Sequence, residues 1–560
     1  MSIINGAIDR RRELLASCNL RENPFVKTEP KSSLIDQVFI GRERELRDAA
    51  MAVVDRPRNV LVVGGYGYGK TTFVRKLLRE LAAAKRRTFL TGYAPLRQDS
   101  AAGFQLAALA AFAEGALDVA PAGAPLHDFA RSLRDELSRL EERPGDRLAP
   151  DLKFREGLRL AEEHGIERVV IAIDEFDKRD AQVVQSVLMG SRFFLDLEAS
   201  FILTGRLLDV FTDVRSSLLA AFDQRIELGL FTPDESRRVI ERNLATARLG
   251  PEPERFRPFT DPVVTAIVDH AMGMPRPINL MAYAALEQGL GDALAGDTSE
   301  LRIGPDVLHH ALQREGNLIF NRVTADARAL LEQVFRRAGY VSGADLDAIS
   351  PSEGIPKAIR DLDDLSREDA VLRLEGAEGA AFAVSHSVEV VMHDLSRRRE
   401  RLRALWDDAL AATTKEQKGK TLEDFAAVFF GEEFRVTERN VRTDTEEIDL
   451  VLEPQASTDP RFRSVYLLAE CKNWRSSKVD QSAVSKLATI LRTRSLHQAF
   501  ILTTGAVTED AFQQARNVLL SDRIEILILD PSSITPYLTS VRPLRDLLAE
   551  THRRHVLRMR

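Results

Sequence analysis

The sequence predicts an α/β protein of several domains. Apolar runs at 59–63, 168–177 and 200–206 are separated by helical patterns, and runs without polar alternation are typical of a parallel sheet covered on both faces. Residues 232–310 have a helical pattern throughout, and a second set of helices and strands begins at residue 421. The 560 residues correspond to three or four domains at about 150 residues each. We therefore expect a covered parallel sheet, a helical region, a small middle domain and a second α/β domain.

The composition is that of an ordinary globular protein. Charged residues make up 29% and hydrophobic residues 44%, and the formal net charge of −7 excludes a simple polycation. Nucleic-acid contacts would therefore come from local basic faces. Two cysteines, Cys18 and Cys471, exclude a disulfide scaffold and a cysteine-based zinc site and fit a reducing cytoplasm. The N-terminus has no apolar run typical of a secretory signal, and polar residues interrupt the Ala-rich stretch 101–125, so we expect a soluble, cytoplasmic protein.

A phosphate-binding loop is predicted directly after the first apolar strand. Gly64-Gly-Tyr-Gly-Tyr-Gly-Lys-Thr71 matches G-x-x-x-x-G-K-[ST] between a strand and a helix. The glycines let backbone N–H groups surround the phosphates, and the helix N-terminus favours negative charge. Lys70 is expected at the β- and γ-phosphates and the Thr71 hydroxyl at Mg²⁺; a chance glycine-rich turn is the alternative. The predicted nucleotide contacts here are Gly64, Gly67, Gly69, Lys70, Thr71 and Thr72, while the bulky Tyr66 and Tyr68 are expected to point outward.

Two acids follow the apolar run 169–173. A parallel sheet binds ligands at the carboxyl ends of its strands, so we expect Asp174 and Glu175 beside the phosphate loop. Asp174 would hold Mg²⁺, and Glu175 would polarise the attacking water. The alternative is a strand that ends in solvated acids.

Further motifs carry a family resemblance. Besides the phosphate loop, the motifs that carry the resemblance are Asn23-Pro-Phe25, Phe39-Ile-Gly-Arg-Glu43, Phe201-Ile-Leu-Thr-Gly-Arg206 and Gly273-Met-Pro-Arg276. With these motifs, residues 21–310 resemble the AAA+ and STAND-type P-loop ATPases. Within these, the chain looks most like prokaryotic relatives of the origin-recognition ATPases. The resemblance implies ATP as the nucleotide and a segment at 23–43 that covers the adenine. It also implies that Arg206 (sensor 1) and Arg276 (sensor 2) contact the γ-phosphate, with surface salt bridges as the alternative.

No arginine finger supplied in trans is identifiable in the sequence. Arg215 and Arg225 are weak candidates. Without such a finger, hydrolysis is expected to be slow and switch-like.

The middle segment has the outline of a winged helix. Three helical patterns and a hairpin at 371–384 lie within residues 322–394. The best recognition-helix candidate, 356–365, has two basic residues against Asp361, Asp363 and Asp364, a balance that disfavours DNA and favours a protein contact or a spacer. The arginines of the following connector, at positions 397, 398, 399, 401 and 403, would either touch DNA or form a solvated helix face.

Three residues near the C-terminus suggest a metal-dependent site. Asp449 opens one strand, and Glu470-Cys471-Lys472 ends the apolar run 465–469. Residues i and i+2 of a strand share a face, so Glu470 and Lys472 project together and Cys471 points away. Antiparallel pairing could bring Asp449 beside Glu470, and two carboxylates with a phosphate suit Mg²⁺. Lys472 would orient the attacking water, and Glu423 could add an outer carboxylate.

The order helix, three strands, helix, strand carries a second resemblance. The segments that carry the resemblance are Lys418–Phe425, Glu447-Ile-Asp449, Glu470–Trp474, Gln481 and Phe500–Thr504. With these segments, residues 418–532 resemble the Mrr-like branch of the PD-(D/E)xK restriction endonucleases. The resemblance implies Asp449, Glu470 and Lys472 as the catalytic set, Glu423 as an accessory acid and Gln481 as an additional active-site residue. Six Lys and Arg against one acid in 471–500 would suit a DNA backbone. Trp474 could stack on a base, although core packing is favoured, and a degenerate domain that only binds DNA is the alternative.

The expected domains are an ATPase core (1–230), a helical lid (231–320), a winged-helix-like domain (321–395), a basic connector (396–420), an Mrr-like nuclease domain (421–545) and a basic tail (546–560). Together they suggest an ATPase and metal-dependent phosphodiesterase: an ATP-regulated, Mg²⁺-dependent endonuclease acting on double-stranded DNA as a homo-oligomer, in prokaryotic defence against foreign DNA. One alternative is an ATP-dependent switch or loader that only grips DNA. Another is a signalling scaffold whose middle domain recruits a protein trigger.

Overall fold

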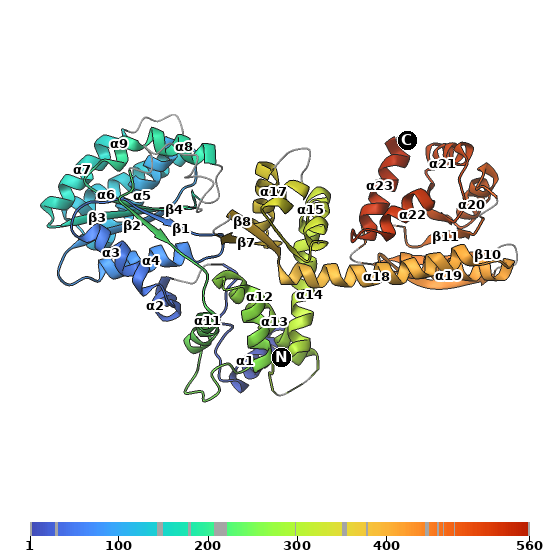
Figure 1. Cartoon of the computed structure of the whole chain (residues 1–560), viewed down its shortest axis with the longest axis horizontal. Coiled ribbons are helices and arrows are strands. Elements are labelled where there is room, and N and C mark those ends of the chain that lie inside the picture. The colour runs from blue at the N-terminus through green and yellow to red at the C-terminus, as the bar shows by residue number, and fades with distance from the viewer. Residues whose placement is uncertain are drawn as a thin grey trace. The chain divides into compact units, whose positions relative to one another are not determined.

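The computed structural model describes residues 3–28, 32–142, 149–176, 181–205, 221–296, 298, 300–349, 355–376, 379–442, 447–455, 458–462, 464–474 and 477–557. The chain divides into two compact units (Figure 1). The first comprises Met1–Ile319 and Tyr340–Val388, and the second comprises Phe320–Gly339 and Glu389–Arg560.

The first unit is built on a five-stranded parallel sheet, as predicted. Its order is β2-β3-β4-β1-β5, with bounds Val60–Val63 (β1), Phe89–Pro95 (β2), Arg168–Asp174 (β3), Ser200–Gly205 (β4) and Gln224–Glu227 (β5). Helices cover both faces (Figure 1). One face carries α3 (Glu43–Val54) and α4 (Lys70–Ala82); the other carries α5 (Ala101–Val119), α6 (Pro125–Glu142), α7 (Pro150–Glu163), α8 (Ala181–Gly190) and α9 (Arg192–Leu195).

The two covered faces explain why the strands show no polar alternation. Val60 and Val62 enter the core under α3 and α4, while Leu61 and Val63 enter the core under α5. Helix α5 is long and apolar enough to cross a membrane by length and composition, but 56% of its most apolar window is buried. It lies so close to β2 that a β-carbon on Gly92 would meet the Ala111 carbonyl oxygen at 2.1 Å. The Ala-rich composition therefore serves close packing of helix on sheet.

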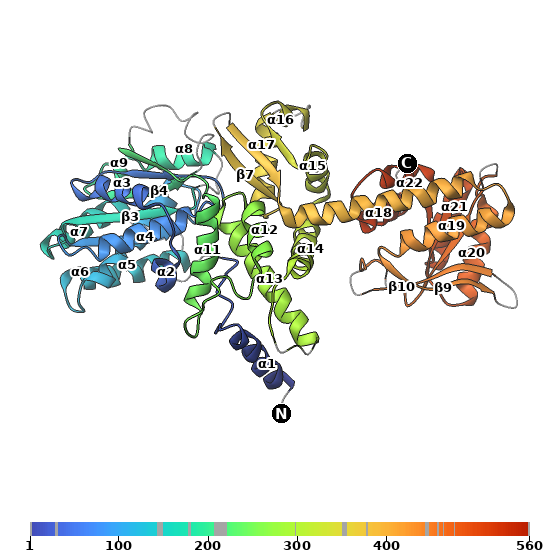
Figure 2. The ribbon, with the colours of Figure 1, turned by 60° about the horizontal axis from the view of Figure 1, so that its bottom comes forward.

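A helical lid follows the sheet. Helices α11 (Pro233–Thr246), α12 (Asp261–Ala271) and α13 (Pro275–Ala295) pack on one another (Figure 2). The N-terminal helix α1 (Ile3–Ser17) packs on α13, where Arg11 forms an ion pair of 2.8 Å with Glu287. Short helical segments at Ser32–Leu34 (η1) and Ile35–Val38 (α2) lead into α3, and α14 (Pro305–Arg322) ends this helical region.

The remaining part of the first unit is a small domain with a three-stranded antiparallel sheet of order β6-β8-β7. Its elements are β6 (Tyr340–Ser342), α16 (Ala344–Ile349), α17 (Ile355–Arg367), β7 (Val371–Gly376) and β8 (Gly379–Val384). The acidic balance of α17 has an internal cause, because Asp363 is buried and forms an ion pair with the buried Arg373 of β7. One of the three acids counted in 356–365 is therefore buried and does not contribute to the surface charge of α17.

Helix α15 (Ala325–Phe335), which the sequence places in the middle domain, packs within the second unit. Its Arg328 forms an ion pair of 2.7 Å with Asp546. The segment expected as one winged-helix-like domain at 321–395 is thus divided between the two units.

The second unit is a mixed α/β domain, as predicted. Its sheet order is β13-β12-β11-β10-β9, with bounds Phe434–Arg442 (β9), Glu447–Pro454 (β10), Leu467–Lys472 (β11), Gln498–Thr503 (β12) and Glu525–Leu529 (β13). The three strands β9, β10 and β11 pair antiparallel, and β11, β12 and β13 pair parallel. One face packs on α18 (His386–Ala411), α19 (Lys415–Phe430), α22 (Pro531–Leu538) and α23 (Leu544–Leu557), and the other packs on α20 (Gln481–Thr493) and α21 (Glu509–Asp522).

The segments expected as a basic connector and a basic tail belong to this core. Leu402 and Trp406 of α18 are buried against α19, and Leu547 of α23 is buried in the same cluster. Arg399 is 3% exposed, forms an ion pair with Glu432 and lies 3.9 Å from the ring centroid of Tyr537. Arg403 donates to the Leu538 carbonyl oxygen at 3.0 Å. Arg399 therefore stabilises the fold and does not face DNA, whereas Arg403 remains exposed.

Candidate active sites

The phosphate loop connects β1 to the N-terminus of α4. Gly67 and Gly69 have φ angles of 83° and 86°, a left-handed conformation that disfavours any side chain. Helix α4 begins at Lys70, so its unpaired N–H groups face the loop. The Lys70 ammonium donates to the carbonyl oxygens of Gly64 at 3.0 Å and Gly65 at 2.8 Å. This cradle fits the phosphates of a nucleotide.

Three hydroxyl groups converge on Asp174 at the end of β3. Thr71 donates to its Oδ2 at 2.6 Å, and Tyr93 of β2 donates to the same oxygen at 2.8 Å. The Thr204 hydroxyl of β4 donates to Oδ1. The structure thus brings together the two predicted metal-binding residues of this site, Thr71 and Asp174. Tyr93 was missed, because only the parallel pairing of β2 with β3 brings it to this edge.

Glu175 takes an unusual backbone conformation. Its φ angle of 73° lies in the left-handed region, where glycine or asparagine is usual. Its N–H group donates to Asp174 Oδ1 at 2.7 Å and to Thr204 Oγ1 at 3.1 Å. Such a conformation persists only where the surrounding structure holds it, and it is enriched at functional sites.

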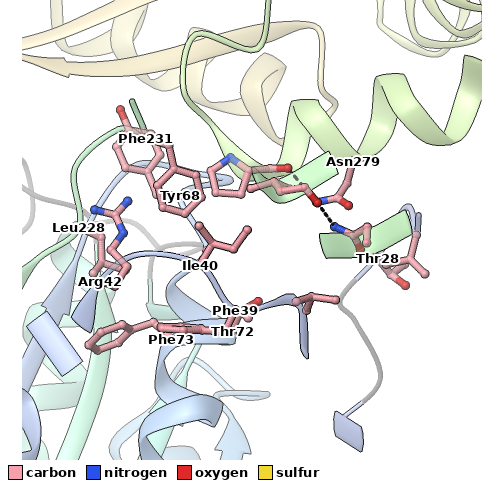
Figure 3. A pocket seen from close by; sticks show the side chains of 16 residues that line it. Thr28, Phe39, Ile40, Arg42, Tyr68, Thr72, Phe73, Leu228, Phe231 and Asn279 are labelled. Carbon is pink, nitrogen blue, oxygen red and sulfur yellow. Dashed lines mark hydrogen bonds between the residues drawn. The ribbon is translucent and has the colours of Figure 1, made fainter. Parts of the chain in front are cut away.

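A pocket opens beside the phosphate loop (Figure 3). Predicted residues line it: Phe39, Ile40 and Arg42 come from the segment before α3, and Thr72 comes from α4. Other lining residues are Val26, Thr28, Val38, Tyr68, Gly69, Phe73, Leu228, Phe231, Val239, Asn243, Pro275 and Asn279. Its mostly apolar wall, which adjoins the cradle, suits the planar base of a nucleotide.

Two expectations about this pocket need correction. Tyr68 does not point outward, because its side chain is 3% exposed and forms part of the wall. Asn23 and Phe25 anchor the chain to the lid and do not line the pocket: Asn23 donates to Glu287 at 2.9 Å, and Phe25 packs edge-on against Phe259.

Arg276 lies directly above the phosphate loop. The backbone N–H group of Arg276 donates to the Gly67 carbonyl oxygen at 3.3 Å, and its guanidinium carbon lies 5.2 Å from the ring centroid of Tyr66. The guanidinium forms two hydrogen bonds with Asp369, a residue that sequence reasoning missed. Arg206 and Arg215 lie outside the described residues, and Arg225 lies 3.7 Å from Glu227 in an exposed ion pair.

The structure brings Asp449, Glu470 and Lys472 together in the second unit. The antiparallel register pairs Leu450 with Ala469, which sets Asp449 opposite Glu470. The Cys471 N–H group donates to Asp449 Oδ2 at 2.6 Å, and the Lys472 ammonium forms an ion pair with Glu470. Cys471 points to the opposite face, as expected, and packs against the core under α19.

Electrostatics distinguish the two acids. Burial, with the negative charge of Glu470 second, raises the pKa of Asp449 to about 7. In the part of the chain that the structure describes, no group of three or more His, Cys, Asp or Glu side chains could hold a metal ion. Asp449 and Glu470 are two carboxylates opposite each other on neighbouring strands. A pair fits Mg²⁺, which fills its other positions with water and phosphate oxygens.

The accessory residues lie around this pair in different ways. Glu423 of α19 accepts a hydrogen bond of 2.8 Å from Asn440, and its charge raises the pKa of Asp449 further. Gln481, at the start of α20, pairs with Gln514 of α21 at 3.4 Å. Trp474 does not pack in the core as favoured, because its side chain is 37% exposed and its ring lies 5.5 Å from the Lys472 ammonium.

Asn473 was missed by sequence reasoning. Its buried amide nitrogen donates to the carbonyl oxygens of Ala409 and Lys418, both at 2.9 Å, and its oxygen accepts from Thr504 at 2.7 Å. It therefore ties the end of β11 to α18, to α19 and to Thr504, the residue that follows β12. The only signal in the sequence is a polar residue directly after the Glu-x-Lys pattern.

Two segments of the chain match known protein families. Residues 38–190 match the AAA ATPase domain family, and residues 414–529 match the restriction endonuclease family of the Mrr catalytic type. No curated protein sequence matches the chain.

Among solved structures, the chain is similar to Cdc6p from Pyrobaculum aerophilum, with 12% identity and a TM-score of 0.34 over 64% of this chain and 94% of that chain. It is also similar to the ORC2 protein of Aeropyrum pernix, with 14% identity and a TM-score of 0.37 over 64% of this chain and 95% of that chain. A third similar structure is the RuvB Holliday junction branch migration motor of Thermotoga maritima, with 16% identity and a TM-score of 0.32 over 62% of this chain and 93% of that chain.

Proposed function

We propose that this chain, which joins an AAA ATPase domain to an Mrr-type restriction endonuclease domain, is an ATP-regulated, Mg²⁺-dependent endonuclease of double-stranded DNA. The observation that carries this proposal is the set Asp449, Glu470 and Lys472 on neighbouring strands, in a chain that also has a phosphate loop and the Asp174 network. We further propose that it acts in the cytoplasm, in prokaryotic defence against foreign DNA.

In the nuclease site, Asp449 and Glu470 would hold Mg²⁺ through their carboxylate oxygens. When bound, Mg²⁺ supplies positive charge to the oxygens of the scissile phosphate. The Lys472 ammonium lies beside Glu470 and would orient the attacking water. Glu423 would bind a water of the metal shell, and Gln481 would act as a further active-site residue on α20.

In the nucleotide site, Lys70 would exchange its loop carbonyls for the β- and γ-phosphates of ATP. Gly64, Gly67, Gly69 and Thr72 would surround the phosphates with backbone N–H groups. Thr71 and Asp174 would hold the metal that accompanies ATP, and Glu175 would orient the water that attacks the γ-phosphate. Arg206 and Arg276 would contact that phosphate as the two sensors.

The DNA would lie over the basic residues that surround Trp474 and α20. Lys478 and Lys486 are candidates for phosphate contacts, whereas Arg492 is engaged with Asp522. Nucleases that cut both strands need two active centres, and AAA ATPases bind nucleotide near subunit boundaries, so we propose a homo-oligomer. A protein trigger that binds the middle domain is the remaining proposed partner.

Supercoiled plasmid cleavage tests the nuclease assignment. Wild-type protein with Mg²⁺ should nick or linearise the plasmid, and Lys472→Ala should abolish cleavage while plasmid binding persists. Lys415→Ala, which removes the same charge from an exposed position at the start of α19, is the matched control and should cleave. Equal cleavage by Lys472→Ala and wild type would contradict the assignment. If wild-type protein leaves the plasmid intact but binds it more tightly in one nucleotide state than in another, the result would favour an ATP-dependent switch that only binds DNA.

A further inference from the structure

Arg276 and Asp369 form a planar, two-bond ion pair within the first unit. Arg276 Nε donates to Asp369 Oδ1 and Nη2 donates to Oδ2, both at 2.8 Å. The two side chains are 31% and 24% exposed, so the pair is largely shielded from water. Paired, shielded geometry of this kind is stronger than an ordinary surface salt bridge. The ion pair ties the start of α13 in the lid to the turn between α17 and β7.

The phosphate loop meets the same point. Tyr68 of the loop, Met274 of the lid, and Leu372 and Ala383 of the hairpin form one buried apolar cluster. Tyr66 lies against the Arg276 guanidinium, and a β-carbon on Gly67 would lie 3.1 Å from the Arg276 β-carbon. The two tyrosines, which are bulky for a phosphate loop, thus connect the loop to the lid and to the β7–β8 hairpin.

Asp369 has a left-handed backbone conformation at the end of α17. Its φ angle of 59° is left-handed, and its N–H group donates to the Ser366 carbonyl oxygen in the turn that ends α17. Glycine is the commonest residue at such a helix end, and asparagine and aspartate also tolerate this conformation. The aspartate at this position presents its carboxylate to Arg276, which donates two hydrogen bonds to it.

The Nε and Nη2 edge of the guanidinium can serve one anion at a time, and it matches a carboxylate and a phosphate equally well. Asp369 occupies this edge, and Nη1 donates to the Lys27 carbonyl oxygen at 3.4 Å, so a phosphate that takes a bidentate grip on Arg276 displaces one of these acceptors. A nucleoside triphosphate places a terminal phosphate above the loop, whereas a diphosphate lacks that group. Only the triphosphate therefore competes with Asp369 for Arg276.

We propose that Asp369 is a positioning residue for nucleotide recognition: it holds Arg276 until a nucleoside triphosphate binds, and transfer of the guanidinium to the terminal phosphate releases the β7–β8 hairpin from the phosphate loop. This inference rests on the proposed ATP site and supplies its regulation. The hairpin leads directly into α18, since β8 ends at Val384 and α18 begins at His386. Helix α18 then continues into the second unit, where Asn473 binds its Ala409 carbonyl oxygen. Release of the hairpin would thus act on a helix that contacts the end of the catalytic strand.

Two measurements on the full-length chain test this proposal without using DNA cleavage. The first is the affinity for fluorescent ATP and fluorescent ADP. Asp369→Asn keeps a residue that tolerates the left-handed conformation and removes the competing charge, so its ATP affinity should rise about fivefold or more while its ADP affinity stays unchanged. Glu368→Gln, an exposed neighbour with the same loss of charge, is the control and should behave as wild type.

The second measurement is hydrogen exchange of the hairpin 371–384. In wild type, a non-hydrolysable ATP analogue should increase exchange there relative to ADP. Asp369→Asn should show high exchange in both states, and Arg276→Gln should show high exchange together with equal affinities for ATP and ADP. Unchanged nucleotide affinities in Asp369→Asn, or equal hairpin exchange of wild type with the ATP analogue and with ADP, would overturn the proposal. Neither measurement depends on DNA cleavage, so both can be made even if the nuclease is inactive. Failure of the proposed nuclease function is therefore distinguishable from failure of the proposed role of Asp369.

Discussion

The N–H group of Cys471 donates a 2.6 Å hydrogen bond to Asp449 Oδ2, across the antiparallel pair β10 and β11. The bond holds the Asp449 carboxyl beside that of Glu470, on the face of β11 that also carries Lys472. Burial of the Asp449 carboxyl disfavours its charged form, and the negative charge of Glu470 adds to the cost of ionisation. This is the physical reason that the pKa of Asp449 is raised to about 7.

Metal binding should therefore depend on pH in the neutral range. A metal ion needs the ionised carboxylate, so below about pH 7 binding must first displace a proton from Asp449. We expect the Mg²⁺ or Mn²⁺ affinity to rise with pH up to about 7 and to level off above it, with a proton released on binding at the lower pH. Calorimetric titration in two buffers of different ionisation enthalpy measures this. Asp449→Asn is the control, and an affinity that is flat from about pH 6 to about pH 8 in wild type would refute the argument.

Asn473 should matter for both stability and cleavage. Asn473→Ala leaves two carbonyl oxygens and the Thr504 hydroxyl without their buried partner, at a cost of about 2 kcal/mol in the free energy of unfolding. Cleavage should fall further than stability explains, because the end of β11 loses its anchor beside Lys472. Thermal unfolding and single-turnover cleavage at a temperature where the variant is folded separate the two effects. Thr504→Val, which removes one of these bonds, should give a smaller loss of both.

The Tyr93 hydroxyl should support ATP hydrolysis. Tyr93→Phe removes a 2.8 Å hydrogen bond to Asp174 and leaves the ring in place. A hydrogen bond to a charged group contributes about 2 kcal/mol, so we expect a fall of about thirtyfold in the rate of hydrolysis with little change in ATP affinity. A phosphate-release assay measures the rate. Tyr340→Phe, at an exposed tyrosine, should hydrolyse ATP at the wild-type rate, and the same result for Tyr93→Phe would argue against a role for its hydroxyl.

The buried pair Arg399 and Glu432 should stabilise the second unit. Glu432→Gln leaves an arginine that is 3% exposed without its counter-charge, which should cost about 3 kcal/mol in the free energy of unfolding. Arg397→Gln removes a charge from the same helix in an exposed pair and should cost far less. Chemical denaturation compares the two variants. Equal stability of the two variants would mean that the buried ion pair does not stabilise the second unit.

Local patterns predicted the parts of both sites that lie close together in the chain. The phosphate loop is one continuous motif, and the spacing of Glu470 and Lys472 places both on one face of a strand. Asp449 could be assigned to the same site because two antiparallel strands that follow each other in the chain have few possible registers. Contacts between distant segments carry no such signal: Arg276 and Asp369 are 93 residues apart, and nothing near either residue indicates the other.

The same reason explains the errors. Arg399 looks like a surface residue because its neighbours are basic, but its partner lies 33 residues further along the chain. Tyr68 is expected to point outward because its loop is small, yet the lid and hairpin supply an apolar wall for it. Burial of these side chains is set by tertiary packing and not by local periodicity.

The central claim is that the nucleotide site controls the nuclease site. Plasmid cleavage with Mg²⁺, by wild type and by Lys70→Ala with and without ATP, tests it most directly, with Lys472→Ala as the inactive reference. We predict that ATP changes the cleavage rate of wild type and leaves the rate of Lys70→Ala unchanged. The claim would be contradicted if Lys472→Ala abolishes cleavage but the cleavage rate is the same in wild type with ATP, in wild type without ATP and in Lys70→Ala.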